Sequence, residues 1–206
     1  MRRLLKSVPL LCLVLVIASC APSPRAFLGE PTSGPLRIAV LPLVNYTQTS
    51  EAPDRLGTIL AVELAKMGGL EVVDPGRVEE VLAYEPWMLT DRIPPDLVDS
   101  LGVKLGVDAL LVGSVLTYEY RQDGGNEIPQ TSLALRMLQC PGGGVLWSAV
   151  HSRDGSDRES IFGFGRTSNL ERLAIESIRE MLKTMPSGLK SGHGSNSAEG
   201  RKGSGK

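Results

Sequence analysis

Residues 108–120, DALLVGSVLTYEY, form the longest strand candidate of the chain, because the run is continuously apolar at first and later alternates between apolar and polar side chains. Residues 132–140 and 145–152 alternate in the same way, and the Pro-Gly-Gly-Gly sequence at 141–144 is typical of a hairpin turn. The polar residues 121–130 are expected to form a loop. The pattern therefore predicts an antiparallel meander of three strands.

Strands and helices alternate before this meander. Residues 36–44 and 70–73 are short runs rich in branched apolar side chains, which favours strands. Apolar residues recur at helical spacing in the segments between the strands, and glycine, proline and a capping aspartate supply the expected helix ends. The expected helices run from Pro53 to the glycine pair at 68–69, from Asp74 to about Glu85, and from Leu97 to Gly106.

One more helix is expected near the C-terminus. Ser168 and Glu171 have the spacing of a capping box, apolar residues line one face of the segment that follows, and Pro186 ends it. The whole pattern predicts one α/β domain over residues 36–186, with a mixed sheet of about five strands packed by about four helices. Residues 187–206 are mostly glycine, serine and charged side chains, and are expected to be disordered.

The N-terminus has the features of a bacterial export signal. Three basic residues lie among the first six, and residues 10–17 form an apolar segment that is short for a membrane-spanning helix. The sequence Ile-Ala-Ser-Cys at 17–20 resembles a lipobox, so we expect a signal peptide over residues 1–19 and a lipid on Cys20. The alternatives are an uncleaved anchor and an ordinary secretory peptide.

The residues after the lipobox bear on where the domain resides. Residues 20–35 are rich in proline, serine and glycine and are expected to form a lipidated, flexible tether. Ala21, rather than an aspartate, follows the cysteine, which by analogy with enteric bacteria favours the outer membrane. The expected location is therefore the outer membrane, with the domain facing the periplasm.

Charge and cysteine content narrow the functional classes. The chain has 22 Lys and Arg against 23 Asp and Glu, so it offers no broad attraction to nucleic acid, and no nucleic-acid partner is expected. Cys12 leaves with the leader and Cys20 carries the lipid, which leaves Cys140 without an internal disulfide partner. Cys140 is expected to be a buried strand residue, the alternative being a reactive or dimer-forming thiol.

Four segments, taken in order, resemble the periplasmic domain of the curli secretion lipoprotein family (CsgG). These are residues 38–42 with Asn45, residues 70–74, residues 106–115 and residues 144–148. The resemblance implies the order strand, helix, strand, two helices, three-strand meander and closing helix. The family includes small outer-membrane lipoproteins, and its fold is similar to that of lipoprotein activators of penicillin-binding proteins. The resemblance therefore implies the fold more firmly than the function.

The chain departs from the curli channel in one respect. That channel inserts long amphipathic hairpins to build a transmembrane barrel, whose strands need about 9–11 residues each. Residues 121–130 are few and polar, and residues 151–166 are crowded with charges. We therefore expect a small family member that does not form the pore.

Two candidate sites lie in connecting segments. Ile161, Phe162 and Phe164 form an apolar spot among glycines, and Trp87 follows a proline; these four residues are the expected partner-binding set. The alternative for the spot is a plug of the core. Trp147 alternates with apolar neighbours on its strand and is expected in the core.

The same connecting segment offers a weaker hypothesis for a ligand. Gly163, Gly165, Arg166 and Ser168 precede a helix, and exposed amides at a helix N-terminus can bind an anion. The dinucleotide fingerprint is incomplete, so ordinary loop geometry is the alternative.

No catalytic or metal-binding constellation is recognisable. His151 lies on a predicted strand, where we expect an ordinary surface or strand residue, and His193 lies in the tail, so the two do not pair. No enzyme activity and no cofactor are therefore expected. The favoured hypothesis is a lipid-anchored, non-catalytic adaptor that helps to assemble an envelope or secretion complex, with self-association as one mode of partnership. The alternatives are a lipoprotein that senses a periplasmic anion or nucleotide, and an activator of a cell-wall synthase.

Overall fold

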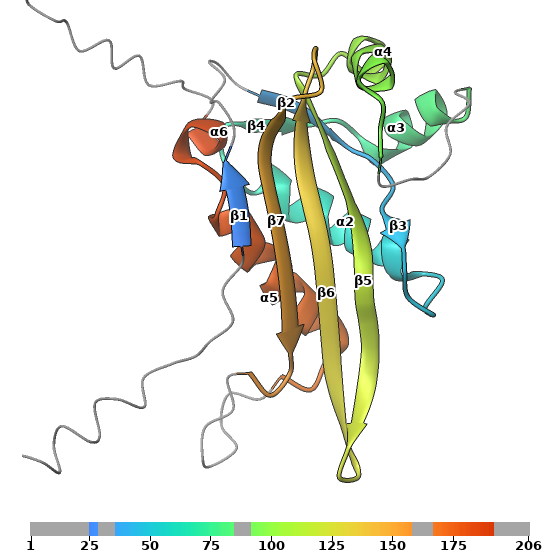
Figure 1. Ribbon diagram of the computed structural model, residues 1–206, viewed down its shortest axis with the longest axis vertical. Helices are drawn as coiled ribbons and strands as arrows, with labels where there is room; N and C mark the ends of the chain where they lie inside the picture. Colours follow the sequence, from blue (N-terminus) through green and yellow to red (C-terminus); the bar gives the residue numbers. More distant parts are fainter. Residues whose placement is uncertain (1–24, 29–35, 85–91, 158–166, 192–206) are drawn as a thin grey trace, which may run out of the picture.

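The computed structural model describes residues 25–28, 36–84, 92–157 and 167–191, and shows one mixed sheet with helices on both faces (Figure 1). The order of strands across the sheet is β1-β7-β6-β5-β2-β4, and β3 pairs with β5 beyond the end of β2. The strands are β1 (Arg25–Leu28), β2 (Leu36–Val40), β3 (Val44–Asn45), β4 (Leu70–Val72), β5 (Ala109–Asp123), β6 (Asn126–Gln139) and β7 (Val145–Asp154). The predicted α/β class is confirmed, and the described sheet has two short strands more than expected.

The predicted antiparallel meander is confirmed as β5, β6 and β7. Gly113 pairs with Leu135 on β6, and Leu135 pairs with Ala149 on β7. The prediction of a loop at 121–130 is wrong, because β5 and β6 continue through this segment and turn at Gly124 and Gly125. Both glycines have positive φ, 56° and 88°, which suits a two-residue hairpin turn.

The far end of this hairpin is polar because it reaches beyond the helices that pack on the sheet (Figure 1). Residues 119–127 are all exposed, so neither face of the two strands has to be apolar there. A strand with water on both faces lacks the alternation of apolar and polar residues that identified the rest of the meander. The alternation therefore stops before the ends of β5 and β6, which is why a loop was predicted there.

Five helices lie in the described residues. They are α2 (Ala52–Ala65), α3 (Pro75–Leu82), α4 (Pro95–Leu105), α5 (Leu170–Lys183) and α6 (Ser187–Ser191). The Asp74 side chain caps α3 by accepting a hydrogen bond from the Gly76 amide at 2.9 Å, and Gly106 ends α4 in the left-handed conformation, as the sequence predicts. The cap predicted for α5 is wrong by one residue: Asn169, not Ser168, accepts the Arg172 amide at 2.8 Å.

Two cores lie on opposite faces of the sheet, because neighbouring residues of a strand point to opposite sides. Ala109 and Leu111 of β5 pack with α2 and α5, which lie behind the sheet in Figure 1. Leu110 and Val112 pack with α3 and α4 on the other face. Trp147 is fully buried in the larger core, as predicted, and its indole N–H donates to Thr184 Oγ1 at 3.0 Å.

Both ends of the domain extend further than predicted. Residues 25–28 were expected within a flexible tether, but they form β1, which pairs antiparallel with β7 so that Arg25 faces Val150. At the other end, residues 187–191 were expected to be disordered, but they form α6. Leu189, the one apolar side chain of α6, is only 1% exposed and joins the larger core, which explains the ordering of this short segment.

A glycine in the centre of the meander permits a close approach of strands. A Cβ atom on Gly113 would overlap the carbonyl oxygen of Ala134 and lie 2.7 Å from Leu135 Cδ2. Gly113→Ala should therefore lower the free energy of unfolding by about 2–3 kcal/mol through overpacking. Gly57→Ala is the control, because a Cβ there meets nothing within 4 Å and alanine favours helix α2 by up to about 1 kcal/mol. Urea unfolding of both variants checks this, and equal losses would contradict the strand-packing argument.

Candidate functional site

Most of the site residues predicted from the sequence lie outside the described residues. This applies to Cys20, Trp87, Ile161, Phe162, Gly163, Phe164, Gly165 and Arg166. Ser168 is described and is exposed. These assignments stay predictions, and the described residues point to a different surface.

The face of the sheet that carries α3 and α4 is only partly covered. Alternate residues along each strand point to this face; β5 contributes Val112 beneath the helices and Ser114 beyond them. Further along, Leu116 of β5 is 40% exposed and Val150 of β7 is 49% exposed. This part of the sheet, which none of the described helices covers, is here called the open face.

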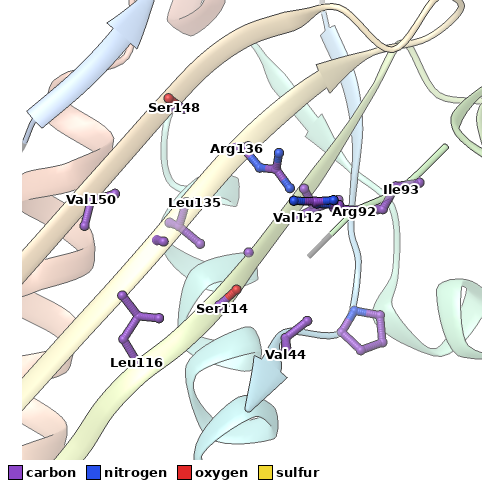
Figure 2. A pocket seen from close by; sticks show the side chains of 13 residues that line it. Val44, Arg92, Ile93, Val112, Ser114, Leu116, Leu135, Arg136, Ser148 and Val150 are labelled. Atoms are coloured by element: carbon purple, nitrogen blue, oxygen red, sulfur yellow. The ribbon is translucent and has the colours of Figure 1, made fainter. Parts of the chain in front are cut away.

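The open face contains a groove with a volume of about 370 Å³. Its walls come from five parts of the chain: the segment after β2, the segment before α4, and the strands β5, β6 and β7 of the meander (Figure 2). The lining residues are Pro42, Val44, Arg92, Ile93, Val112, Gly113, Ser114, Leu116, Ala134, Leu135, Arg136, Ser148 and Val150. No sequence motif indicated this groove, because its residues are adjacent only in the folded sheet.

Two arginines line the groove among the described residues, and each of them also has an interaction within the protein. Arg92 and Arg136 are its charged side chains among the described residues, and no described aspartate or glutamate lines it. Figure 2 labels both arginines among the side chains that line the groove, together with Leu116 and Val150. The groove therefore combines two arginine side chains with apolar side chains from the sheet.

A second polar cluster lies on the opposite face, between β7 and α5. His151 is 2% exposed, and its Nε2 lies 3.0 Å from Glu180 Oε2. Arg153 Nη1 lies 2.9 Å from Glu176 Oε2 and 3.5 Å from Glu180 Oε1, as ion pairs without hydrogen-bond alignment. His151 is a strand residue, as expected, but it is buried and paired rather than at the surface.

The position of this cluster favours a structural role. Ser177 Oγ, a hydroxyl in the same helix, is completely buried and makes no hydrogen bond. A nucleophile needs contact with substrate, and none can reach a fully buried hydroxyl without opening the core. The contacts of the cluster join α5 to the sheet.

Cys140 lies just after β6 rather than within it, and it is half-buried against the smaller core. Burial, assisted by Asp99 and Asp108, raises the pKa of the thiol to about 11. Only the thiolate reacts, so alkylation by iodoacetamide at pH 8 should be about 100-fold slower than for a free cysteine. Mass spectrometry of timed samples measures this rate; a rate equal to that of glutathione would indicate a reactive thiol instead.

Two further chemical properties concern the described residues. Within residues 25–28, 36–84, 92–157 and 167–191, no three His, Cys, Asp or Glu side chains gather as metal ligands. None of the helices α2 to α6 combines the length and the apolar character needed to cross a bilayer.

Comparisons with known proteins indicate the fold. No protein-family model and no curated protein matches the chain. The PelC dodecamer from Paraburkholderia phytofirmans is similar in structure, with 20% identity over 79% of this chain and 98% of that chain and a TM-score of 0.55. A second PelC dodecamer structure from this organism, of a single-substitution variant, has 22% identity over 82% of this chain and 98% of that chain, with a TM-score of 0.57. The lipoprotein GNA1162 from Neisseria meningitidis has 22% identity over 58% of this chain and 83% of that chain, with a TM-score of 0.51. The chain thus shares its α/β fold with PelC and GNA1162.

Proposed function

We propose that this protein is a lipid-anchored, non-catalytic adaptor of the bacterial envelope, which binds a protein partner through the open face of its sheet. The observation that carries the proposal is the open face itself. Helices α2 and α5 pack on one face of the sheet, whereas on the other face Leu116 and Val150 remain exposed beside the groove. Uncovered apolar surface rimmed by polar groups is typical of interaction sites.

The anchor is proposed from the lipobox and from the kinds of protein that share the fold. Acylation of Cys20 would hold the domain on a membrane, and the resemblance to the curli secretion lipoproteins favours the outer membrane. GNA1162 is a lipoprotein, and PelC forms a dodecamer. Because both share the fold of this chain, we propose that the adaptor acts within an assembly, and self-association is one such arrangement.

The pairing of β1 with β7 supports a role close to the membrane. Arg25 follows Cys20 by five residues, which span at most about 18 Å when fully extended. Arg25 faces Val150, a residue of the groove. A lipid on Cys20 would therefore keep the edge of the groove within about 25 Å of the bilayer surface.

Photo-crosslinking in intact cells tests the partner surface. A benzoylphenylalanine at position 116 should form adducts with an envelope protein, whereas the same group in place of Val103, which is 84% exposed on α4, should not. Introducing Val150→Asp should reduce the adducts at position 116 at least fivefold, because a partner would have to desolvate the new charge. Val62→Asp, at a position 47% exposed on α2, is the matched control and should leave the adducts unchanged. Adducts at position 103 alone would contradict the assignment of the open face.

A further inference from the structure

We propose that a basic depression between α2, α5 and α6 binds the anionic phospholipid headgroups of the membrane that holds the anchor. The inference rests on the proposed function, because it requires a lipid on Cys20 and states which side of the domain the membrane meets. It follows from the excess of positive charge in the depression, from its position beside β1, and from its place on the sheet face opposite the open face.

The depression has a volume of about 250 Å³ and lies at the C-terminal ends of α2 and α5, next to α6. Cationic and apolar side chains line most of it. The cations are Lys66, Arg179, Lys183 and Lys190, the carboxylate is Glu63, and Met67 and Leu182 supply apolar surface. The depression therefore combines positive charge with an apolar lining, the combination that an amphipathic anion requires.

The internal contacts of these side chains leave an excess of positive charge. Glu63 accepts hydrogen bonds from Arg179 Nε at 2.8 Å and from Lys66 Nζ at 2.7 Å, so one carboxylate faces two cations. Lys190 Nζ donates to the main-chain carbonyl of Lys183 at 2.6 Å, and a carbonyl carries no net charge. The Lys183 side chain is exposed to water. Four cations against one carboxylate thus give an excess of three positive charges.

The carboxylates further along α5 do not offset this excess. Glu176 lies 2.9 Å from Arg153 and 3.2 Å from Arg172, and Glu180 lies 3.5 Å from Arg153, so two arginines match these two carboxylates. In the depression itself, burial lowers the pKa of Lys190. A phosphate group beside this ammonium would favour its charged form and so counteract the effect of burial.

The depression lies on the side of the domain from which the tether leaves. Leu28 of β1 pairs with Trp147, whose indole N–H donates to Thr184, the residue that follows Lys183. Figure 1 shows β1 next to α5 and α6 on one side of the molecule. Strand β1 begins five residues after the expected lipid site, and five residues span at most about 18 Å. The anchor would therefore keep this side of the domain close to the bilayer.

Contact between this surface and the bilayer would leave the open face free for a protein. The helices α2 and α5 pack on one face of the sheet, and Leu116 and Val150 of the open face lie on the other. Lysine and arginine also suit a membrane surface, because their apolar stems can lie on Met67 and Leu182 while the charged groups reach the headgroups. Each such cation near an anionic bilayer strengthens binding about fivefold.

Stabilisation of helix ends is the alternative role for these lysines. Cations in the last turn of a helix interact favourably with its free carbonyl groups, and Lys183 lies in the last turn of α5. This role needs no membrane. A measurement of lipid binding therefore separates the two roles, whereas a measurement of stability alone does not.

Co-sedimentation with vesicles tests the inference. The protein is the full mature chain, residues 20–206, with Cys20→Ser so that no acyl chain contributes. The vesicles contain either phosphatidylcholine alone or phosphatidylcholine with about a third phosphatidylglycerol. We expect at least tenfold tighter binding to the anionic vesicles, and loss of this preference at about 1 M salt, where charges are screened within about 3 Å.

Paired variants locate the effect on the protein. Lys183→Gln should weaken binding to the anionic vesicles about fivefold, and its combination with Lys190→Gln at least tenfold. Arginine at both positions should restore binding. The control combines Arg55→Gln with Arg77→Gln, which removes two exposed cations outside the depression, and should leave binding within twofold of the original protein.

Three results would overturn the inference. They are equal binding to the two kinds of vesicle, equal losses in the two double glutamine variants, and complete displacement from anionic vesicles by millimolar inorganic phosphate at constant ionic strength, which would indicate a site for a free anion. If any of these occurs while crosslinks from position 116 persist, the adaptor function stands and only the membrane contact is wrong. If the lipid preference holds but crosslinks are absent, the proposed adaptor function fails instead.

Discussion

Replacing Arg153 with methionine is expected to lower the free energy of unfolding by about 3–5 kcal/mol, the usual cost of removing one partner from a buried ion pair. The Arg153 side chain is 3% exposed and lies against Glu176 and Glu180. Methionine fills much of the same space but carries no charge. Glu180 would then lose a cation 3.5 Å from its Oε1 in a site where its own side chain is only 17% exposed.

Two further variants separate charge from packing. Arg153→Met combined with Glu180→Gln should recover about half of the loss, because the second change removes the uncompensated charge. Arg77→Met breaks an exposed i,i+3 pair with Glu80 and should leave the urea midpoint nearly unchanged. A loss below about 1 kcal/mol for Arg153→Met would show that water reaches the cluster and that its burial is incomplete.

The inward position of Arg153 also illustrates what could not be predicted from the sequence. The segment 145–152 alternates, which was enough to predict the strand and the burial of Trp147. The same alternation places His151 and Arg153 on the inner face, where charged side chains are rare unless paired. Their partners, Glu176 and Glu180, lie on a helix that the strand pattern does not identify. The sequence therefore allowed a surface position for His151 and gave no sign that Arg153 is buried.

The elements at the ends were missed for a different reason. Strand β1 has only four residues, and α6 contributes a single buried leucine, so neither contains enough periodicity to separate it from a tether or a tail. The formation of β1 depends on its pairing with β7, and that of α6 depends on contact with the larger core. Both contacts exist only in the folded domain. Two adjacent capping residues, Ser168 and Asn169, gave the same ambiguity at the start of α5, since both are favoured at this position.

The candidate groove could not be predicted from the sequence, although the three strands of the meander that line it were predicted. Ala134, Arg136 and Val150 acquire their relationship from the register of β6 against β7. The sequence singled out aromatic residues in connecting segments, because exposed aromatic side chains are frequent in interfaces. The open face instead exposes aliphatic residues on regular strands, and this becomes visible only when the helices that cover the sheet are placed.

Acid should destabilise the domain through two carboxylates, and the last prediction concerns their titration. Glu63 of α2 accepts hydrogen bonds from Arg179 Nε at 2.8 Å, from Arg179 Nη2 at 3.0 Å and from Lys66 Nζ at 2.7 Å. The hydrogen bonds from Arg179 outweigh the effect of burial and lower the pKa of Glu63 to about 2. Burial alone would raise the pKa of Asp154, but hydrogen bonds from Ser156, Gln130 and Arg121 lower it to about 2 as well.

The sign follows from proton linkage. A carboxyl group whose pKa is lower in the folded protein than in the unfolded chain binds protons preferentially when unfolded. Each group therefore contributes stability that is present above about pH 4.5 and is lost as the pH falls towards 2. Glu63 should contribute about 2 kcal/mol and Asp154 about 1–2 kcal/mol, figures reduced from about 1.4 kcal/mol for each pKa unit because their cationic partners are largely in water.

Urea unfolding at pH 7, 4 and 2.5 tests the linkage, with the variants compared at each pH because other carboxyl groups titrate in the same range. Glu63→Gln should be less stable than the original protein at pH 7, and the difference should shrink to about a quarter of that value by pH 2.5, as the pH approaches the folded pKa of about 2. Asp154→Asn should behave in the same way. A difference that stays constant from pH 7 to pH 2.5 would mean that Glu63 holds α2 against α5 by shape and hydrogen bonding rather than by its charge.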